Sequence, residues 1–231
     1  MVEPDAGLRV TTVTEHVTLT ARTRPSEGGT GDETSGWLDR GTAIMRRILI
    51  GGIAAGVVVF AWGAISHMLL PTGEMGIKRI PNEETVLGTL KDSIQEPGLY
   101  FFPGMDMSRK PTPEEEKAWT ERYQAGPTGI LVYNPAGGSP LSPRQLLTEL
   151  ASNIAAALLA AWIVSQVSGR YGRRAILVMG MGLFAWLCLS VSYWNWYGFP
   201  AATTLSEAID QVGGWLFGGL ILAAIVKPPP K

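Results

Sequence analysis

Residues 48–70 form an uninterrupted apolar stretch in which no side chain carries a formal charge. An α-helix rises about 1.5 Å per residue, so about 20 apolar residues cross the roughly 30 Å hydrocarbon core of a membrane. Residues 146–167, 175–191 and 205–226 are similarly apolar, and Ser192 and Tyr193 extend the third segment. The sequence therefore predicts an all-α fold, a four-helix transmembrane bundle with a small extracytoplasmic α+β module between spans one and two.

Seven basic residues near the ends of the predicted spans fall on one side, if the chain crosses the membrane four times. They are Arg46, Arg47, Arg170, Arg173, Arg174, Lys227 and Lys231. The turn predicted at residues 194–204, between spans three and four, contains no basic residue. Because Lys and Arg collect on the cytoplasmic side of membrane proteins, we expect both termini in the cytoplasm and residues 71–145 outside it.

Charge and composition exclude several functions. The chain has 19 basic and 20 acidic residues, a net charge of −1, whereas a nucleic-acid partner requires a basic face. A single Cys excludes an internal disulfide and a Cys-based zinc site. The two histidines are His16 and His67, and His16 lies in the tail, so we do not expect a bis-histidine haem. Since the sequence has no phosphate-binding loop, GxSxG or HExxH motif, we expect no metal, no cofactor and no catalytic residue.

The parts outside the spans differ in character. Residues 1–44 are rich in Thr, Gly and Glu and contain few large apolar side chains, which predicts a disordered N-terminal tail. Met45 followed by two arginines is also typical of the start of a membrane protein, so an alternative is that the native chain begins there. The remaining organisation is span one at 45–70, the module at 71–145, and spans two to four at 146–231.

The module alternates helix and strand signals. Asn82, followed by two glutamates, predicts a helix start, and Thr112 with Glu115 predicts a capping box at the start of a second helix. Short strands are predicted at 99–102 and 129–133, each bounded by Pro and Gly. Because two short strands do not hold a core alone, we expect the module to lean on the membrane helices or on another protein.

Capping signals also precede two of the spans. Ser142 and Gln145 have the three-residue spacing of a capping box before span two. Thr204 and Glu207 have the same spacing before span four. This pattern favours Glu207 as a helix cap over a charge buried in the bundle.

Four glycines have the small-xxx-small spacing that lets membrane helices approach closely. They are Gly52 and Gly56 in span one, and Gly214 and Gly218 in span four. Close packing within or between chains is one interpretation. The other is coincidence, because membrane helices use Gly freely.

Aromatic residues gather after span three. The cluster consists of Tyr193, Trp194, Trp196 and Tyr197. Trp and Tyr favour the level of the lipid headgroups, so an interfacial aromatic belt is the simplest interpretation. A stacking site for a quinone, lipid or pigment is the alternative.

Polar residues are expected at one depth near the outer surface. His67 lies near the outer end of span one, and Asp210 lies at a similar depth in span four. Glu149 and Asn153 enter from the same side in span two. Each side chain could reach headgroup water by itself. The alternative is that His67 and Asp210 meet close to Glu149 or Asn153 and form a proton-sensitive or ligand-binding pocket, since ionisable groups in spans usually face the bundle interior.

Several motifs, moderately specific as a set, resemble a known family between residues 45 and 228. They are Trp62 and His67 in span one, Leu70-Pro71, Asn82-Glu83-Glu84, Pro97-Gly98-Leu99-Tyr100, Phe102-Pro103-Gly104, Gly126-Pro127, and the run from Tyr193 to Pro200. In this order they resemble a family of small uncharacterised bacterial inner-membrane proteins with four predicted spans. The resemblance implies a multi-pass location in the bacterial inner membrane and assigns no activity to any residue.

Three functions remain open from the sequence. The first is a non-enzymatic protein, a structural or accessory subunit whose partners are the lipid bilayer and other membrane subunits or further copies of the chain. The second is a small transporter or channel acting as an oligomer, although the middle of each span lacks charge. The third is a membrane enzyme with a polar site near the outer surface.

Overall fold

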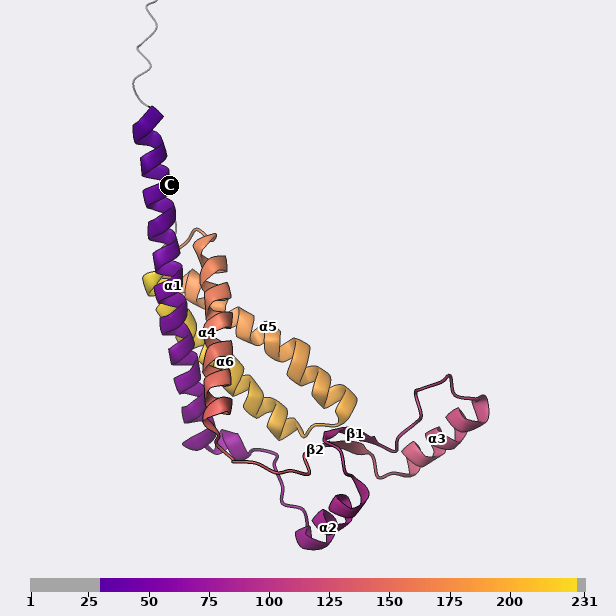
Figure 1. Cartoon of the computed structure of the whole chain (residues 1–231). Helices are drawn as coiled ribbons and strands as arrows, with labels where there is room; N and C mark the ends of the chain where they lie inside the picture. The colour runs from indigo at the N-terminus through magenta and orange to yellow at the C-terminus, as the bar shows by residue number, and fades with distance from the viewer. Residues whose placement is uncertain (1–29, 228–231) are drawn as a thin grey trace, which may run out of the picture. The chain divides into compact units, whose positions relative to one another are not determined.

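A computed structural model describes the backbone of residues 30–227 and the side chains from residue 40 onward. The elements in chain order are α1 (Thr30–Met68), the 3₁₀ turn η1 (Pro71–Glu74), α2 (Glu83–Ser93), β1 (Gly98–Phe102), α3 (Pro113–Ala125), β2 (Gly129–Tyr133), α4 (Pro143–Ser165), α5 (Tyr171–Tyr197) and α6 (Ala201–Ile225) (Figure 1). The chain divides after Asp39 into two units.

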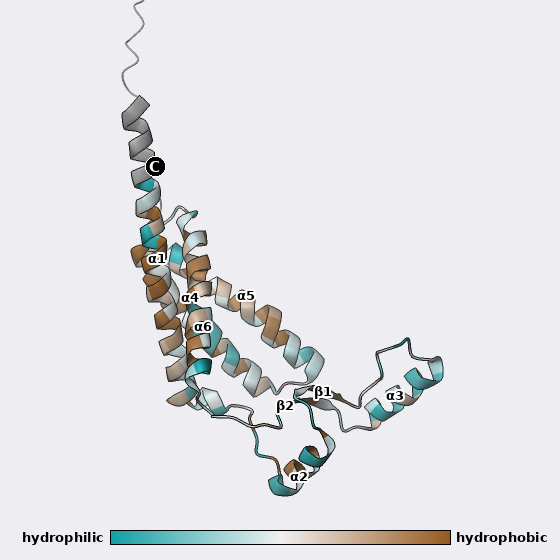
Figure 2. Ribbon diagram, viewed as in Figure 1, coloured by the Kyte–Doolittle hydropathy of each residue, from teal (hydrophilic) through white to brown (hydrophobic). Residues whose placement is uncertain are grey.

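Four of these helices are long and apolar enough to cross a membrane. They are the Arg40–Met68 part of α1, together with α4, α5 and α6. In Figure 2, hydrophobic residues dominate the described length of α1, whereas α3 is largely hydrophilic. The prediction of four apolar helices accompanied by two short strands is confirmed, and the chain has the makeup of a multi-pass membrane protein.

Helix α1 begins earlier than the sequence pattern predicts. Residues 30–44 belong to the predicted disordered tail, yet they are helical and continuous with the apolar segment. No proline occurs between Pro25 and Pro71, so nothing in the chain blocks a helix from propagating backwards once the apolar segment has nucleated it. The rest of the predicted tail, residues 1–29, lies outside the described residues.

The turn between α5 and α6 is shorter than predicted. Helix α5 continues through the aromatic residues to Tyr197 and is capped by Gly198, which adopts a left-handed φ of 70° without the steric cost that a Cβ atom would bring. Helix α6 begins at Ala201, directly after Pro200. The predicted capping box is therefore wrong: Thr204 lies inside the helix, its hydroxyl donates to the Pro200 carbonyl, and Glu207 is not a cap.

The other predicted caps have mixed outcomes. The capping boxes of α3 (Thr112 with Glu115) and α4 (Ser142 with Gln145) are both confirmed. Helix α2 does begin directly after Asn82, but this residue has a left-handed φ of 52° and its side chain makes no capping hydrogen bond. Asn tolerates this conformation better than most residues, which explains its place before the helix.

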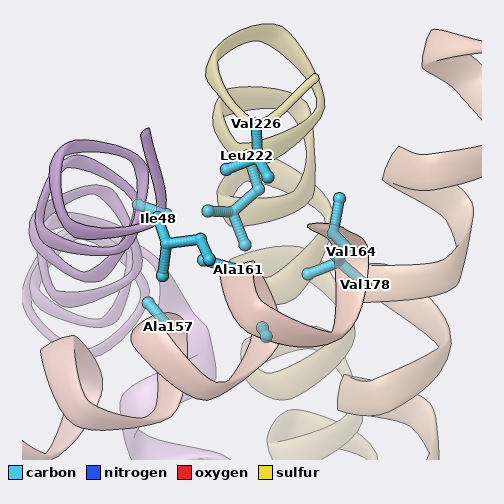
Figure 3. Close-up of a cluster of buried hydrophobic side chains, with 9 residues drawn as sticks. Ile48, Ala157, Ala161, Val164, Val178, Leu222 and Val226 are labelled. Atoms are coloured by element: carbon cyan, nitrogen blue, oxygen red, sulfur yellow. The ribbon is translucent and has the colours of Figure 1, made fainter. Parts of the chain in front are cut away.

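The hydrophobic core lies where all four apolar helices meet. Its buried residues are Ile48 and Ala55 of α1, Ala157, Ala160, Ala161 and Val164 of α4, Val178 of α5, and Leu222 and Val226 of α6. Figure 3 draws these nine side chains and labels seven of them. Most are small, which lets the helix backbones approach closely, and such packing rather than exclusion of water holds helices together in lipid.

Helices α5 and α6 form a tight antiparallel hairpin. A Cβ atom on Gly182 would lie 2.6 Å from the Gln211 carbonyl oxygen, and one on Gly219 would lie 2.7 Å from the Ala175 carbonyl oxygen. The indole of Trp186 donates to the Thr204 carbonyl at 2.8 Å. Because a side chain at either glycine would collide with backbone, the two helices are fixed in one rotation relative to each other.

The two ends of the bundle differ in composition. We call the end that carries Arg46, Arg47, Arg170, Arg173, Arg174 and Lys227 the basic end. The guanidinium of Arg174 at the start of α5 donates to the carbonyls of Ala223 and Val226 at the end of α6, which places both helix termini at this end. We call the opposite end, where η1 follows α1, the module end.

The sheet of the module is a β-hairpin with a helix in its connection. Strands β1 and β2 pair antiparallel from Gly98 opposite Tyr133 to Phe102 opposite Gly129, and α3 lies between them in the chain. Trp119 of α3 donates its indole N–H to the Pro103 carbonyl at 2.8 Å. The predicted strands are confirmed, and they pair with each other.

The segment after α1 is fastened to α6 at the module end. Thr72 of η1 donates to the Ser66 carbonyl at 2.5 Å and accepts, at its own carbonyl, a 2.6 Å hydrogen bond from the Ser206 hydroxyl. The Thr203 hydroxyl donates to the Met75 carbonyl at 3.0 Å. The first bond satisfies a carbonyl that the end of α1 leaves free. The other two tie the linker to α6.

Candidate functional site

His67 and Asp210 lie together at the module end. His67 is in the last turn of α1, and its Nε2 lies 3.8 Å from the Asp210 Oδ2 of α6. The imidazole is 60% exposed and the carboxylate 20% exposed. A separation of 3.8 Å is within ion-pair range but too long for a hydrogen bond, so this carboxylate oxygen remains able to accept from another donor.

Glu149 and Asn153 form the second pair of the predicted polar layer. The amide nitrogen of Asn153 donates to Glu149 Oε1 at 3.2 Å, one turn apart on α4. Both residues line a small cavity of about 50 Å³ that Asp210 also lines. The structure therefore brings the four residues to one end of the bundle as two pairs. Asp210 of the first pair lines the same small cavity as Glu149 and Asn153 of the second.

Trp62 supports this site, although the sequence reasoning did not assign it a role there. Its indole N–H donates to the Asp210 carbonyl at 3.1 Å, and its ring packs 4.9 Å from that of Phe217. A partly buried indole needs a hydrogen-bond partner. Its position one turn before Ser66 and His67 on α1 is the signal that it faces the same region.

A larger cavity adjoins Asp210 on the side of α5. It has a volume of about 350 Å³, and the polar residues that line it are His67, Ser190, Tyr193, Glu207, Asp210 and Gln211. Glu207, Asp210 and Gln211 are three or four residues apart or adjacent on α6, so they share one helix face. That spacing is the signal that could have placed Glu207 here instead of at a helix cap.

The predicted close-packing glycines all lie at helix contacts within the chain. A Cβ atom would lie 2.5 Å from the Leu158 side chain at Gly52 and 2.5 Å from the Ile154 Cα at Gly56, where α1 meets α4. At Gly214 and Gly218 it would lie 3.1 Å from Trp62 and 2.9 Å from Val59, where α6 meets α1. The two pairs thus hold α1 between α4 and α6.

The aromatic cluster occupies the last turn of α5, not a loop. Tyr193, Trp194, Trp196 and Tyr197 are all exposed. The Tyr193 ring lies 5.9 Å from that of Tyr197 and 5.5 Å from that of Phe199. Tyr193 also lines the larger cavity, so one member of the cluster belongs to the polar site.

No group of three or more His, Cys, Asp or Glu side chains in the described part of the chain could hold a metal ion.

Comparisons of the chain with protein-family models, with curated proteins and with solved structures found no match. The class of protein is therefore defined by its own fold, four apolar helices with a polar site at one end and a small module attached there.

Proposed function

We propose that the chain is a multi-pass protein of the bacterial inner membrane that acts without catalysis, as an accessory subunit of a membrane complex. The observation that carries this proposal lies in the module. Leu99 of β1 and Val132 of β2 stand directly opposite each other, and they are 66% and 81% exposed. Neither residue belongs to the apolar helices that lipid would cover.

The module is poorly buried in other respects. Helices α2 and α3 contain no buried residue among those described. Burying apolar surface contributes about 25 cal/mol per Å², and a folded segment of this size normally hides most of its apolar side chains. An exposed apolar cross-strand pair on such a segment is typical of a surface that another subunit covers.

Orientation is part of the proposal. The basic end would face the cytoplasm under the positive-inside tendency, and the module would face the periplasm. Reporter fusions after Lys231 and within residues 168–174 should report the cytoplasm, and fusions near Gly138 should report the periplasm. A periplasmic C-terminus would contradict this arrangement.

The subunit proposal is tested by native electrophoresis and native mass spectrometry after mild extraction from the source membrane. We expect a complex larger than one chain, which the double variant Leu99→Ser/Val132→Ser dissociates. Met107→Ser is the matched control, because Met107 is also an exposed apolar residue of the module but lies outside the sheet. A single chain with no associated subunit, or equal dissociation by both variants, would contradict the proposal.

A second candidate is a small transporter or channel acting as an oligomer, or a membrane enzyme with its polar site near the outer surface. The observation that favours it is the pair of cavities around Asp210. Flux of a solute across sealed liposomes that contain the purified chain would favour the transporter or channel over the accessory subunit. The core where the four helices meet contains apolar residues, so a pathway would have to run between chains.

A further inference from the structure

Several of the polar side chains that line the larger cavity at the module end make no hydrogen bond with any described residue. Ser190 is only 7% exposed, and its hydroxyl makes no hydrogen bond with any residue in the described part of the chain. The same holds for the Glu207 carboxylate and the Gln211 amide over residues 40–227. Glu207 and Gln211 are only partly buried, but Oδ1 of Asp210, which lines the same cavity, is buried without a hydrogen-bond partner among the described residues. Buried polar groups are nearly always hydrogen-bonded, so an unpartnered carboxylate oxygen beside the buried Ser190 indicates a ligand.

The charge of the lining selects the kind of ligand. Glu207 and Asp210 contribute two carboxylates, and the basic group among the lining residues is the His67 imidazole. No lysine or arginine lines this cavity or the smaller one beside it, where Glu149 adds a third carboxylate. Carboxylates in an apolar environment repel anions and attract cations more strongly than they would in water.

The size and the remaining walls indicate an organic cation. A volume of about 350 Å³ lies near the lower end of the roughly 300–1,000 Å³ found for small-molecule sites. Ala185 and Leu189 form apolar walls, and Tyr193 offers an aromatic ring to a positive charge. A bare metal ion would leave these walls unused, and an ammonium group on a short carbon chain would contact them.

We propose that this cavity binds an organic ammonium group, supplied either by the headgroup of an aminophospholipid or by a free amine. The N–H donors of the ammonium would be accepted by Glu207 and by Asp210 Oδ2, with Ser190 and Gln211 completing its contacts. His67, 3.8 Å from that oxygen, is a competitor for the same carboxylate. The site would operate whether or not the module docks on a partner, so it goes beyond the proposed function.

The experiment uses the purified full chain in nanodiscs of phosphatidylglycerol, a lipid without an amine. Hexylamine, which is protonated at neutral pH, should raise the temperature of thermal unfolding in a saturable manner, because a ligand that binds the folded state stabilises it. Hexanol, of the same length and uncharged, should not. Glu207→Gln and Asp210→Asn should each weaken the apparent hexylamine affinity by roughly ten- to a hundredfold, as expected for loss of a charged acceptor.

Two further variants separate binding from folding. His67→Ala removes the competitor and should bind hexylamine at least as tightly as the unchanged chain. Glu116→Gln removes an exposed carboxylate of α3, outside the cavity, and should leave the affinity unchanged. If Asp210→Asn does not fold, Glu207→Gln and Ser190→Ala carry the test. Equal stabilisation by hexanol and hexylamine, or full affinity in Glu207→Gln, would overturn the proposal.

A second arm distinguishes the two sources of the ammonium group. In nanodiscs containing phosphatidylethanolamine, native mass spectrometry should detect retained phosphatidylethanolamine on the unchanged chain and its loss in Glu207→Gln if the ligand is a lipid headgroup. Saturable stabilisation by hexylamine without retained lipid would assign the site to a free amine. The absence of both retained lipid and stabilisation by hexylamine would refute the ammonium site.

Discussion

Replacing Gly56 by Ala should destabilise the bundle, whereas the same replacement at Gly63 on the same helix should not. A Cβ atom at Gly56 would lie 2.5 Å from Cα and 2.8 Å from the backbone nitrogen of Ile154. Carbon atoms in favourable contact are about 3.5–4.0 Å apart, and the backbone of α4 has no rotamer by which to move away. Helices α1 and α4 would therefore have to separate by roughly 1 Å.

The magnitude follows from two opposing contributions. Forcing extra atoms into a packed interface costs about 1–3 kcal/mol. Ala also gains up to about 1 kcal/mol over Gly in helix propensity. At Gly63 no heavy atom of a neighbouring described residue lies within 4 Å of the position that a Cβ atom would take, so only the gain in helix propensity acts there. Since propensity is common to both variants, their difference in unfolding free energy reports the strain, about 1–3 kcal/mol.

Unfolding of the purified variants by sodium dodecyl sulfate in mixed micelles, followed by circular dichroism, measures this difference. Equal stability of Gly56→Ala and Gly63→Ala would falsify the close approach of α1 and α4. A greater loss at Gly63 than at Gly56 would contradict the packing still more directly.

Three further predictions concern charged groups. Arg174→Met removes a buried guanidinium from the last carbonyls of α6 and should cost about 1.5–3 kcal/mol in the same unfolding assay; an unchanged midpoint would exclude this cap. Hydrogen bonding to Arg109 holds the pKa of Glu115 below its ordinary value, so this contribution to the stability of α3 is present at neutral pH and is lost as the pH falls through the lowered pKa. Hydrogen exchange of α3 amides should show this loss in the unchanged chain and not in Glu115→Gln. His67→Ala and Asp210→Asn should couple by about 0.3–1 kcal/mol in a double-mutant cycle of thermal stability, and strictly additive effects would separate the two residues.

Local signals predicted the module well. The strands at residues 99–102 and 129–133 and the capping box at Thr112 all occur in the structure. Each depends on interactions within a few residues, which a single sequence records directly. The pairing of the strands with each other was not predicted, because it depends on how α3 closes the connection between them.

Helix ends near the membrane surface were predicted less well. The aromatic residues before Gly198 could belong to either a helix or a loop, and helix propensity does not decide between them. Thr204 and Glu207 have the spacing of a capping box, which predicts a helix start at Thr204. Pro200, whose φ is fixed by its ring, instead caps the helix one turn earlier, and α6 begins at Ala201. The error placed Glu207 at the surface and hid its relation to Asp210.

The depth of each polar residue along its span could be predicted from the sequence, but the rotation of each helix about its own axis could not. Counting residues from the ends of the spans gave His67 and Asp210 similar depths, and their side chains lie 3.8 Å apart. Ser190 and Tyr193 were not assigned to the site because the rotation of α5 against α6 depends on contacts at Gly182 and Gly219. In lipid the outer face of a helix is as apolar as its inner face, so hydrophobic periodicity does not show which side of α5 faces the cavity.

The two ends of the bundle differ in their packing. At the basic end the core residues are closely packed, and Arg174 holds α6 against α5. At the module end, two cavities adjoin Asp210, whose Oδ1 is buried without a hydrogen-bond partner among the described residues. Leaving such a group unpartnered costs stability. Ser206, which binds the carbonyl of Thr72 in η1, lies four residues before Asp210 and therefore on the same face of α6. The contact with η1 and the proposed ammonium site therefore share one face of α6.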